Sequence, residues 1–373
     1  MYKVMCVFGT RPEAIKLAPV IKELQRYPDT LKSIVTVTAQ HRQMLDSVLG
    51  VFSIKPNYDL NIMRANQGLS DITCKILKDI EAIYESEKPD LVLVQGDTTT
   101  VFASSLAAYY KQIPVGHVEA GLRSRDKYHP FPEEVNRCLT SVIASLHFAP
   151  THAAKANLLN EGIAESAICV TGNTVIDALL EVASREFTFD NDVLNGIKGK
   201  MVLITAHRRE SFGKPFTDMC NAILVLARRY PEVTFVYPVH LNPNVRNTVF
   251  PILGNAPNVI LIEPLEYVPF VHLMKRSCII LTDSGGIQEE APSLHKPVLI
   301  LREVTERPEV VLAGGAKLVG TNPDAIIAET SLLLEDVEEY NRMSHIPNPF
   351  GDGHAAQRIV DFIRNTFINE DRK

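Results

Sequence analysis

Short apolar runs alternate with longer amphipathic runs along the first half of the chain. The apolar runs cover residues 4–8, 34–38, 91–94 and 114–118, and helical patterns cover residues 13–25, 70–87 and 101–110. The second helical pattern is the clearest, because Ile72, Ile76, Ile80 and Ile83 share one face and Ser70 stands where an N-cap is expected. Continuous apolar strands that alternate with helices predict a parallel sheet covered on both faces.

The same alternation starts again after an acidic and less periodic stretch at residues 186–200. A second set of strands is predicted at residues 201–205, 233–237, 259–262, 278–281 and 298–301. The fold class is therefore α/β, with two Rossmann-like, doubly wound domains. We expect the domains at residues 1–185 and 186–353. A last helix within 354–373 follows a turn-rich segment and is expected to pack back on the N-terminal domain.

One stretch of the second half, residues 281–309, has the pattern of an anion-binding corner. An apolar strand runs into Ser284, Gly285 and Gly286, and a run of helix formers begins at Ile287. Backbone N–H groups at such a corner point outward, and residues without a Cβ let a diphosphate come close. Arg302 and Arg307 follow the next strand. A plain strand–turn–helix corner explains the same letters equally well.

Polar and ionisable residues follow the predicted strands in both halves. In the first half they are Gly9 to Arg11, Gln95 to Thr98 and Glu119 to Gly121; in the second they are His207 to Glu210, His240, Glu263 and Asp283 to Gly285. Ligands of doubly wound sheets bind beyond the carboxyl ends of the strands. This recurrence favours a catalytic cleft between the two domains over ordinary surface loops.

Composition restricts the class of partner. The chain of 373 residues is 46% hydrophobic and 22% charged, with a net charge of −6, which argues against a nucleic-acid surface. No apolar run is long enough for a membrane span, and the N-terminus lacks the layout of a signal peptide. The six cysteines form no CxxC pair, and buried free thiols are the favoured interpretation. We therefore expect a cytoplasmic protein with no membrane partner.

Three patterns that suggest a cofactor or a metal are better explained otherwise. Residues 351–356 fit a loose GxGxxA motif, but no strand precedes them, so no NAD is expected. Asp190 and Asp192 imitate a DxD motif inside the acidic linker. No HExxH motif occurs, and we expect neither a metal nor another cofactor.

Seven motifs together resemble a known family, the non-hydrolysing UDP-N-acetylglucosamine 2-epimerases. The motifs are FGTRPEAIKLAPV (8–20), VQGDTTT (94–100), HVEAGLRS (117–124), PFPEEVNR (130–137), TAHRRE (205–210), TDSGGIQEEAP (282–292) and RPE (307–309). The resemblance runs from about residue 3 to the last helix. It implies a GT-B type fold and interconversion of UDP-GlcNAc and UDP-ManNAc, in which UDP is expelled to give a 2-acetamidoglucal and then adds back.

The resemblance also implies roles for particular residues. Asp97, Glu119 and Glu133 are the expected carboxylates around the sugar, with His207 at the phosphate side. Which carboxylate removes the proton and which returns it stays open. Taken singly, Asp97 is equally a helix N-cap, Glu119 a loop charge, and Glu133 an acid favoured at a helix start.

Binding roles carry over in the same way. The residues expected to bind substrate are Arg11, Lys16, Ser284, Gly285, Gly286, Glu290 and Arg307, with the uracil pocket near residues 264–270. A second UDP-GlcNAc site, as an activator, is only partly matched, by Gln40, His41, Gln43, Arg209 and His240. Asn66 stands where a basic residue is expected, with Arg64 close by. The resemblance further implies a homodimer and a role in cell-surface polysaccharide synthesis.

Two other functions fit the same nucleotide-binding groups. A GT-B glycosyltransferase would use the diphosphate site but would not need three carboxylates around the sugar. A UDP-sugar sensor would bind without turnover.

Overall fold

The computed structural model describes residues 1–39, 42–64 and 67–368, and its contacts divide the chain into two compact units. Unit 1 comprises Met1–Ala178 and Phe350–Lys373, and unit 2 comprises Leu179–Pro349. The first division falls within helix α7 (Thr174–Ala183), ahead of the acidic stretch in which the sequence predicts the linker. Gln40, His41 and Asn66 lie outside the described residues.

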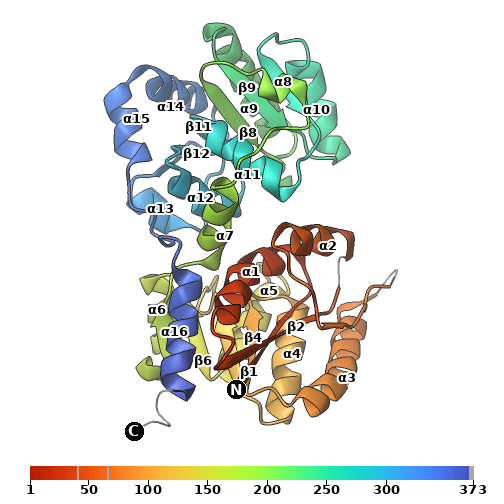
Figure 1. Cartoon of the computed structure of the whole chain (residues 1–373). Helices are drawn as coiled ribbons and strands as arrows, with labels where there is room; N and C mark the ends of the chain where they lie inside the picture. The colour runs from red at the N-terminus through yellow and green to blue at the C-terminus, as the bar shows by residue number, and fades with distance from the viewer. Residues whose placement is uncertain (40–41, 65–66, 369–373) are drawn as a thin grey trace. The chain divides into compact units, whose positions relative to one another are not determined.

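Unit 1 contains a parallel sheet of seven described strands in the order β3-β2-β1-β4-β5-β6-β7 (Figure 1). The strands are β1 (Tyr2–Phe8), β2 (Leu31–Val37), β3 (Tyr58–Asp59), β4 (Leu91–Gln95), β5 (Val115–Val118), β6 (Leu146–Ala149) and β7 (Ile168–Val170). The helices are α1 (Arg11–Gln25), α2 (Arg42–Val51), α3 (Leu69–Glu87), α4 (Thr99–Tyr110), α5 (Glu133–Ile143), α6 (His152–Asn160), α7 and α16 (Ala355–Phe367). The order of the first six strands is that of a Rossmann sheet, with its switch point between β1 and β4.

Unit 2 repeats this order with six described strands, β10-β9-β8-β11-β12-β13, all parallel. The strands are β8 (Met201–Thr205), β9 (Thr234–Pro238), β10 (Val259–Ile262), β11 (Ile279–Thr282), β12 (Val298–Ile300) and β13 (Ala316–Leu318). The helices are α8 (Asp192–Asn195), α9 (Lys214–Arg229), α10 (Pro243–Leu253), α11 (Tyr267–Arg276), α12 (Gly285–Glu290), α13 (Pro308–Leu312), α14 (Pro323–Glu335) and α15 (Val337–Ser344). Its switch point lies between β8 and β11.

The predicted fold class, α/β with two doubly wound parallel sheets, is confirmed. Each predicted strand is present within a few residues of its expected bounds. The strands bury side chains on both faces. In β1, Met5 and Val7 lie in one core cluster, and Val4, Cys6 and Phe8, which alternate with them, are also fully buried. Continuous apolar runs therefore predicted the sheets correctly.

Helix α3 shows where the sequence pattern was right and where it was wrong. Ile72, Ile76 and Ile80 are buried as expected. However, α3 begins at Leu69, so Ser70 is its second residue and not its N-cap. The backbone N–H of Gly68, the observed N-cap, donates to Asp71 Oδ2 at 2.9 Å.

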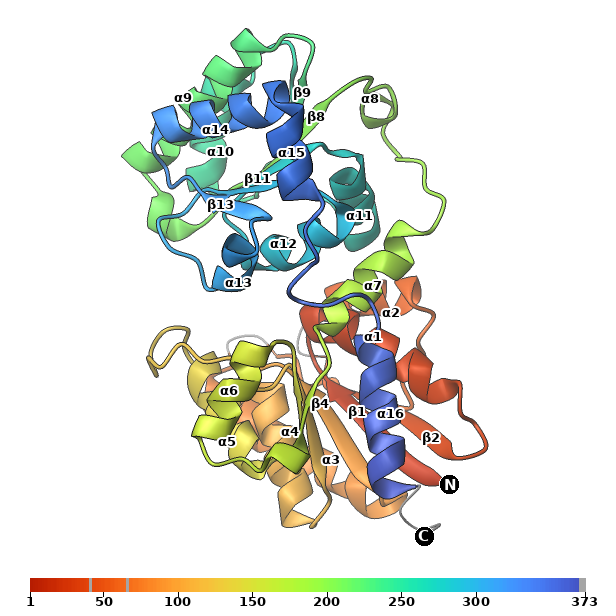
Figure 2. The same cartoon turned by 90° about the vertical axis from the view of Figure 1, so that its left-hand side faces the viewer.

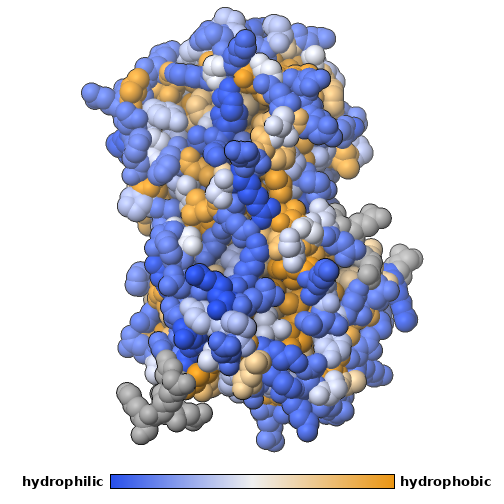
Figure 3. Space-filling model, in the orientation of Figure 1, coloured by the Kyte–Doolittle hydropathy of each residue, from blue (hydrophilic) through white to orange (hydrophobic). Residues whose placement is uncertain are grey.

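The C-terminal helix α16 packs in unit 1, against α1 (Figures 1 and 2). Its aromatic residues meet strand residues: Phe362 meets Phe148 edge-on at 5.9 Å, and Phe367 stacks on Tyr2 at 5.2 Å. The solvent side of unit 1 around α16 is predominantly hydrophilic (Figure 3). Among the described residues, no helix combines the length and the apolar character needed to cross a membrane.

The six cysteines are all free, and only Cys6 and Cys220 are buried. Cys74 is exposed on α3, so the expectation of buried thiols holds for only part of the set.

Candidate active site

In unit 1 the loop after β1 is held tightly at the switch point. A Cβ on Gly9 would lie 2.1 Å from Thr38 Oγ1 and 2.6 Å from Thr100 Oγ1, so only glycine fits there. The carboxylate of Glu13, which is buried in the first turn of α1, accepts the backbone N–H groups of Gly9 at 2.8 Å and Thr10 at 2.6 Å. Its other oxygen accepts Thr98 Oγ1–H at 2.5 Å. Glu13 therefore joins the loops after β1 and β4, which lie at adjacent strand ends.

Glu119 follows β5 and carries the most densely bonded carboxylate of this edge. Lys16 Nζ lies 2.6 Å from Oε1 and 2.8 Å from Oε2, Asn173 Nδ2 donates to Oε1 at 2.9 Å, and Gln95 Nε2 donates to Oε2. Glu119 also has a left-handed backbone, with φ of 66°, which costs free energy for a residue with a Cβ. An ammonium and two amides all donate to it, which favours the ionised form.

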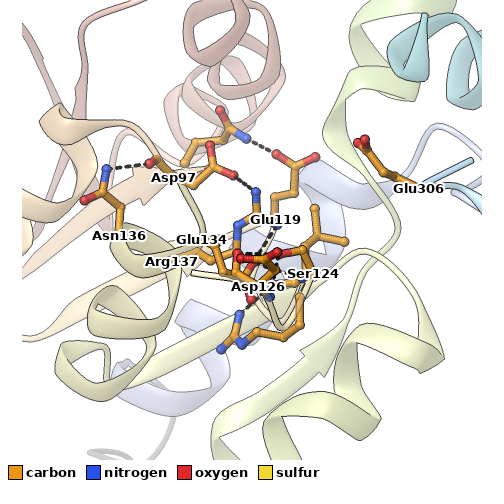
Figure 4. A network of polar contacts seen from close by, with 12 residues as sticks. Asp97, Glu119, Ser124, Asp126, Glu134, Asn136, Arg137 and Glu306 are labelled. Atoms are coloured by element: carbon orange, nitrogen blue, oxygen red, sulfur yellow. Dashed lines mark hydrogen bonds and ion pairs between the residues drawn. The ribbon is translucent and has the colours of Figure 1, made fainter. Parts of the chain in front are cut away.

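Asp97 lies at the end of the neighbouring strand, β4, in a different environment. Arg137 of α5 binds its Oδ2 at 2.5 Å, and Asn136 Nδ2 donates to its main-chain oxygen at 3.0 Å (Figure 4). Burial raises the pKa of Asp97 and the negative charge of Glu119 raises it further, while Arg137 and Lys16 act in the opposite direction. Thr98, not Asp97, caps α4, so the helix-cap explanation of Asp97 is wrong.

Glu133 and Glu134 begin α5, and the structure separates their roles. Glu134 is buried and accepts the backbone N–H groups of Ser124 and Arg125, each at 2.9 Å. The side chain of Glu133 is half-buried and forms no hydrogen bond or ion pair with other described residues. Glu134 thus fixes the preceding loop, while Glu133 has its carboxylate available for a ligand.

The two basic residues predicted to contact phosphate both lie on α1. Arg11 is half-buried at its first position, and its guanidinium has no hydrogen bond to a described residue. Lys16 lies one and a half turns further on and is paired with Glu119. Unit 1 therefore brings Lys16, Asp97 and Glu119 together, with Arg11 at the start of the same helix.

In unit 2 the helix of the predicted anion-binding corner begins two residues earlier than expected, at Gly285 instead of Ile287. Helix α12 begins at Gly285, so Gly285 and Gly286 form its first turn, and a short 3-10 helix (Ala291–Leu294) continues it past Pro292. A Cβ at Gly285 would meet nothing within 4 Å, and at Gly286 only Ser284 Oγ at 4.0 Å. There is therefore open space at the positions where side chains would stand on these two residues, which leaves room for a diphosphate to approach the backbone.

Each of the two arginines after β12 has an acidic partner, the exposed Glu210 for one and the buried Glu289 for the other. Arg302 is buried, and its Nε donates to Glu210 at 2.6 Å. Arg307 is half-buried, and its Nε donates to the buried Glu289, which lies beside Glu290 on α12. Arg302 thus ties the loop after β12 to the loop after β8, whereas Arg307 is anchored beside α12.

His207 follows β8 and lies against a buried carboxylate at the end of β11. Its ring stacks on that of His240, with the centroids 5.1 Å apart and the planes 8° apart, and its Nδ1 lies 3.6 Å from Asp283 Oδ1. Burial lowers the pKa of His207, and Asp283 opposes this shift. Of the residues expected at a second nucleotide site, His240 is therefore beside His207, and Arg209 is exposed in a 3-10 helix (Arg209–Ser211). Gln43 belongs to α2.

Four residues to which the sequence prediction gave no role contact these candidates directly: Gln95, Arg137, Asn173 and Asp283. Gln95 and Asp283 lie at strand ends where the sequence already shows a group of polar residues. Asn173 follows β7, a strand that the pattern did not predict, so its position carried no signal. Arg137 lies one helical turn after Glu133, so a helix at this position predicts that the two side chains share one face.

The GxGxxA-like motif at residues 351–356 and the DxD-like motif at Asp190 and Asp192 have local structural explanations. The backbone N–H groups of Ala355 and Ala356, at the start of α16, donate to Asp177, at 3.2 and 2.8 Å. A carboxylate therefore occupies the place that a phosphate would take at a GxGxxA turn. Asn191, between Asp190 and Asp192, caps α8. Within the described ranges, no three His, Cys, Asp or Glu residues are grouped so that they could hold a metal.

Two Rossmann-ordered sheets, each with ionisable side chains beyond its switch point, define a two-domain α/β protein of the class shared by glycosyltransferases of the GT-B type. The fold alone extends to distant proteins: the glycotransferase of kitacinnamycin matches with a TM-score of 0.63 at 14% identity, over 96% of this chain and 98% of that one.

The comparisons also assign the chain to one family within this fold class. The model of the UDP-N-acetylglucosamine 2-epimerase family matches residues 22–364, and the chain belongs to that family. The UDP-N-acetylglucosamine 2-epimerase of Escherichia coli (strain K12) is 54% identical over 375 residues, covering 98% of this chain and all of that protein. The crystal structure of the Neisseria meningitidis UDP-GlcNAc 2-epimerase bound to UDP-GlcNAc superposes with a TM-score of 0.85 at 53% identity, over 97% of this chain and 100% of that one. The predicted family and the predicted enzyme class, an isomerase, are confirmed.

Proposed function

We propose that this chain interconverts UDP-GlcNAc and UDP-ManNAc by inverting C2 of the sugar. Family membership over nearly the whole chain supports the activity. The observation that carries the proposal is the pair Asp97 and Glu119, two carboxylates at adjacent strand ends in different environments, one beside a guanidinium and one held by three donors. Neighbouring carboxylates whose environments differ are suited to opposite roles in proton transfer.

The reaction we propose proceeds by elimination and re-addition. The C2 proton is not adjacent to a carbonyl, so its direct removal at neutral pH is slow. If UDP leaves C1 while a base removes the C2 proton, the product is 2-acetamidoglucal held beside UDP. UDP then adds back to C1, and an acid delivers a proton to the other face of C2. Atoms and charge balance over the cycle, and no cofactor is needed.

In unit 1, Asp97, Glu119 and Glu133 are the proposed acid–base groups at the sugar. The raised pKa of Asp97 suits a group that carries a proton part of the time, and the donors around Glu119 suit one that stays ionised. Glu133, whose side chain forms no hydrogen bond with another described residue, is the third carboxylate proposed to contact the sugar. Arg11 is the proposed phosphate contact of this unit.

In unit 2, the proposed diphosphate contacts are Ser284, Gly285, Gly286 and Arg307, with His207 beside them and Glu290 on the ribose hydroxyls. The open space before the glycines supports close approach of an anion. Donors aimed at the departing diphosphate stabilise the charge that develops as the C1–O bond breaks. We propose residues 264–270 as the uracil contact.

The decisive experiment is incubation with UDP-GlcNAc alone in D2O, followed at C2 by NMR. We expect deuterium at C2 together with UDP-ManNAc. Turnover only with an acceptor would replace the proposal with a glycosyltransferase, and hydrolysis to free sugar would contradict a non-hydrolysing epimerase. Tight binding with no exchange would replace it with a UDP-sugar sensor.

The assembly and the setting are also proposals. We propose a homodimer, in a cytoplasmic pathway that supplies ManNAc to a cell-surface polysaccharide. Helix α5 carries an apolar stripe with exposures of 39% at Val135, 42% at Leu139 and 81% at Val142, which a second copy would cover. Sedimentation of the full chain tests this, since a monomer at micromolar concentration would contradict it.

We further propose that UDP-GlcNAc activates its own epimerase from a second site that includes Gln43, Arg209 and His240, together with Gln40 and His41. The position of His240 against His207 offers a direct link to the catalytic groups. UDP-ManNAc turned over at full rate without UDP-GlcNAc, on a hyperbolic rate curve, would contradict activation.

A further inference from the structure

The side chain of Asp283 is placed so that its two oxygens have different tasks. It follows β11, is only 1% exposed, and lies across the switch point from the residues after β8. Oδ2 accepts two backbone N–H groups, those of His207 and Arg208, each at 2.6 Å. Oδ1 is also buried but has no hydrogen-bond partner among the described residues, and His207 Nδ1 lies 3.6 Å from it.

An unused oxygen on a buried carboxylate costs free energy, so its position calls for an explanation. The two backbone bonds fix the plane of the carboxylate, and they also fix the main chain of the histidine that Oδ1 faces. Nδ1 of His207, 3.6 Å away, is only slightly beyond hydrogen-bond distance of Oδ1. Holding the loop requires only Oδ2, because that oxygen accepts both backbone N–H groups, so the loop does not explain the position of Oδ1.

Among the described residues, Asp283 is the negatively charged group that acts on His207. His240, which follows β9, stacks on the ring, and Arg208 adds a positive charge. Burial, His240 and Arg208 each lower the pKa of His207, and Asp283 raises it. Without Asp283, a proton on this imidazole would face only unfavourable interactions.

We propose that Asp283 is a positioning residue for His207: it receives Nδ1–H, fixes the tautomer, and stabilises the imidazolium, so that Nε2 faces the substrate as the proton-exchanging atom. The inference rests on the proposed function for the identity of the substrate, but the pairing itself does not depend on it. In the forward direction the imidazolium donates its Nε2 proton to the departing diphosphate and becomes the neutral ring protonated on Nδ1; it takes the proton back from UDP when UDP adds again to C1.

The first test needs no substitution. In the wild-type protein, the ¹⁵N shifts of the neutral His207 imidazole should show the proton on Nδ1, with Nε2 unprotonated. Resonances are assigned by their loss in His207→Asn. A neutral ring protonated on Nε2 would overturn the proposal, whatever the enzyme's activity.

The second test is Asp283→Asn, which keeps one oxygen for the two backbone N–H groups and turns an NH2 group toward Nδ1. We expect kcat to fall about tenfold to a hundredfold, with KM and UDP affinity changed less than about threefold. Removing the anion lowers the pKa of His207, so the limb of the kcat–pH profile that reports this histidine moves to lower pH, as does its NMR titration. An unmoved titration would overturn the proposal.

A double-mutant cycle separates positioning from general damage. If Asp283 acts through His207, Asp283→Asn in a His207→Asn background should lower kcat no further; independent, multiplying losses would overturn the proposal. Asp336→Asn is the control for loss of the backbone bonds, because the exposed Asp336 also accepts two backbone N–H groups, those of Glu338 at 2.9 Å and Glu339 at 3.0 Å, and has no contact with a histidine among the described residues. It should leave kcat and the His207 titration unchanged. Failure of wild-type C2 exchange in D2O would refute the proposed function alone, since the tautomer and the titration would still decide the pairing.

Discussion

Glu119 in unit 1, with a side chain 7% exposed, and the buried Asp283 in unit 2 both carry a carboxylate just beyond a parallel strand, yet the two carboxylates are held in opposite ways. Three side chains, Lys16, Gln95 and Asn173, donate to Glu119. Two backbone N–H groups donate to one oxygen of Asp283, and the other oxygen faces His207. The first site is specified by side chains from several elements, and the second mostly by the main chain. The first should therefore be the more sensitive to substitution of its neighbours.

The largest effect should come from Glu119→Gln. The amide cannot act as a base and sets an NH2 group against obligate donors, so we expect kcat to fall at least about a thousandfold while UDP binding is retained. Asp97→Asn and Glu133→Gln should also lose most turnover and keep UDP. Steady-state kinetics and calorimetry with UDP measure both quantities. Loss of folding in all three variants would make these carboxylates structural.

The second effect concerns two histidines, His117 and His147, whose pKa is lowered mainly by burial, with only a smaller opposing effect from Glu119 and Glu161 respectively. His117 and His147 are buried in unit 1, and burial lowers the pKa of each to about 4. The unfolded chain takes up protons near pH 6.5, before the folded state does. Stability is therefore complete above about pH 6.5 and is lost as pH falls toward 4, by about 3 kcal/mol per histidine.

Urea unfolding of unit 1 signals between pH 8 and pH 5 measures this slope. Burial raises the pKa of Glu13 and of Asp177, which opposes the loss, so the informative comparison is with His147→Gln. The variant should show a shallower slope. Equal slopes for both proteins would contradict the assignment.

The third prediction separates two adjacent acids of α5. Glu134→Gln replaces a buried acceptor of two backbone N–H groups and should cost about 1–3 kcal/mol of stability. Glu133→Gln should change stability by less than about 0.5 kcal/mol, because its side chain has no such bonds. Thermal unfolding of both variants tests the contrast, and a reversed order would assign the structural role to Glu133.

The smallest effect is expected for Asn173→Ala, which removes one of the three donors around Glu119. We expect kcat to fall about tenfold. Asn173→Asp keeps the oxygen that accepts Val175 N–H at 3.1 Å but brings a second negative charge toward Glu119, so its loss should be larger. Equal kinetics for the two variants would show that Asn173 only begins α7.

The sequence predicted the sheets well, because strands buried on both faces must be continuously apolar. It predicted less well where structure depends on a neighbour distant in sequence. Ser70 has the right side chain for an N-cap, but Asp71 bonds the backbone N–H of Gly68 instead. Strands β3, β7 and β13, of two or three residues, are too short to show a period.

The same distinction between local pattern and distant contacts applies to the residues of the candidate site. Asp97, Glu119 and His207 follow predicted strands, so their placement at one edge of each sheet could be expected. The partners that set their charge could not, because Arg137, Asn173 and Asp283 meet them only through the packing of the folded chain. Spacing along the sequence carries no record of those contacts.

Both chain segments that link unit 1 to unit 2 begin at one point. The Cα of Gly351 lies 3.1 Å from where a Cβ on Gly172 would be, and the backbone N–H of Asn173 donates to Phe350 O at 2.6 Å. Unit 2 is thus inserted into unit 1, whose last helix is made only after all of unit 2. During synthesis unit 2 can therefore finish folding before unit 1, because α1 cannot pack against α16 until α16 has been made. A ribosome-stalled chain ending before Ala355 should therefore resist protease in unit 2 and remain susceptible in unit 1.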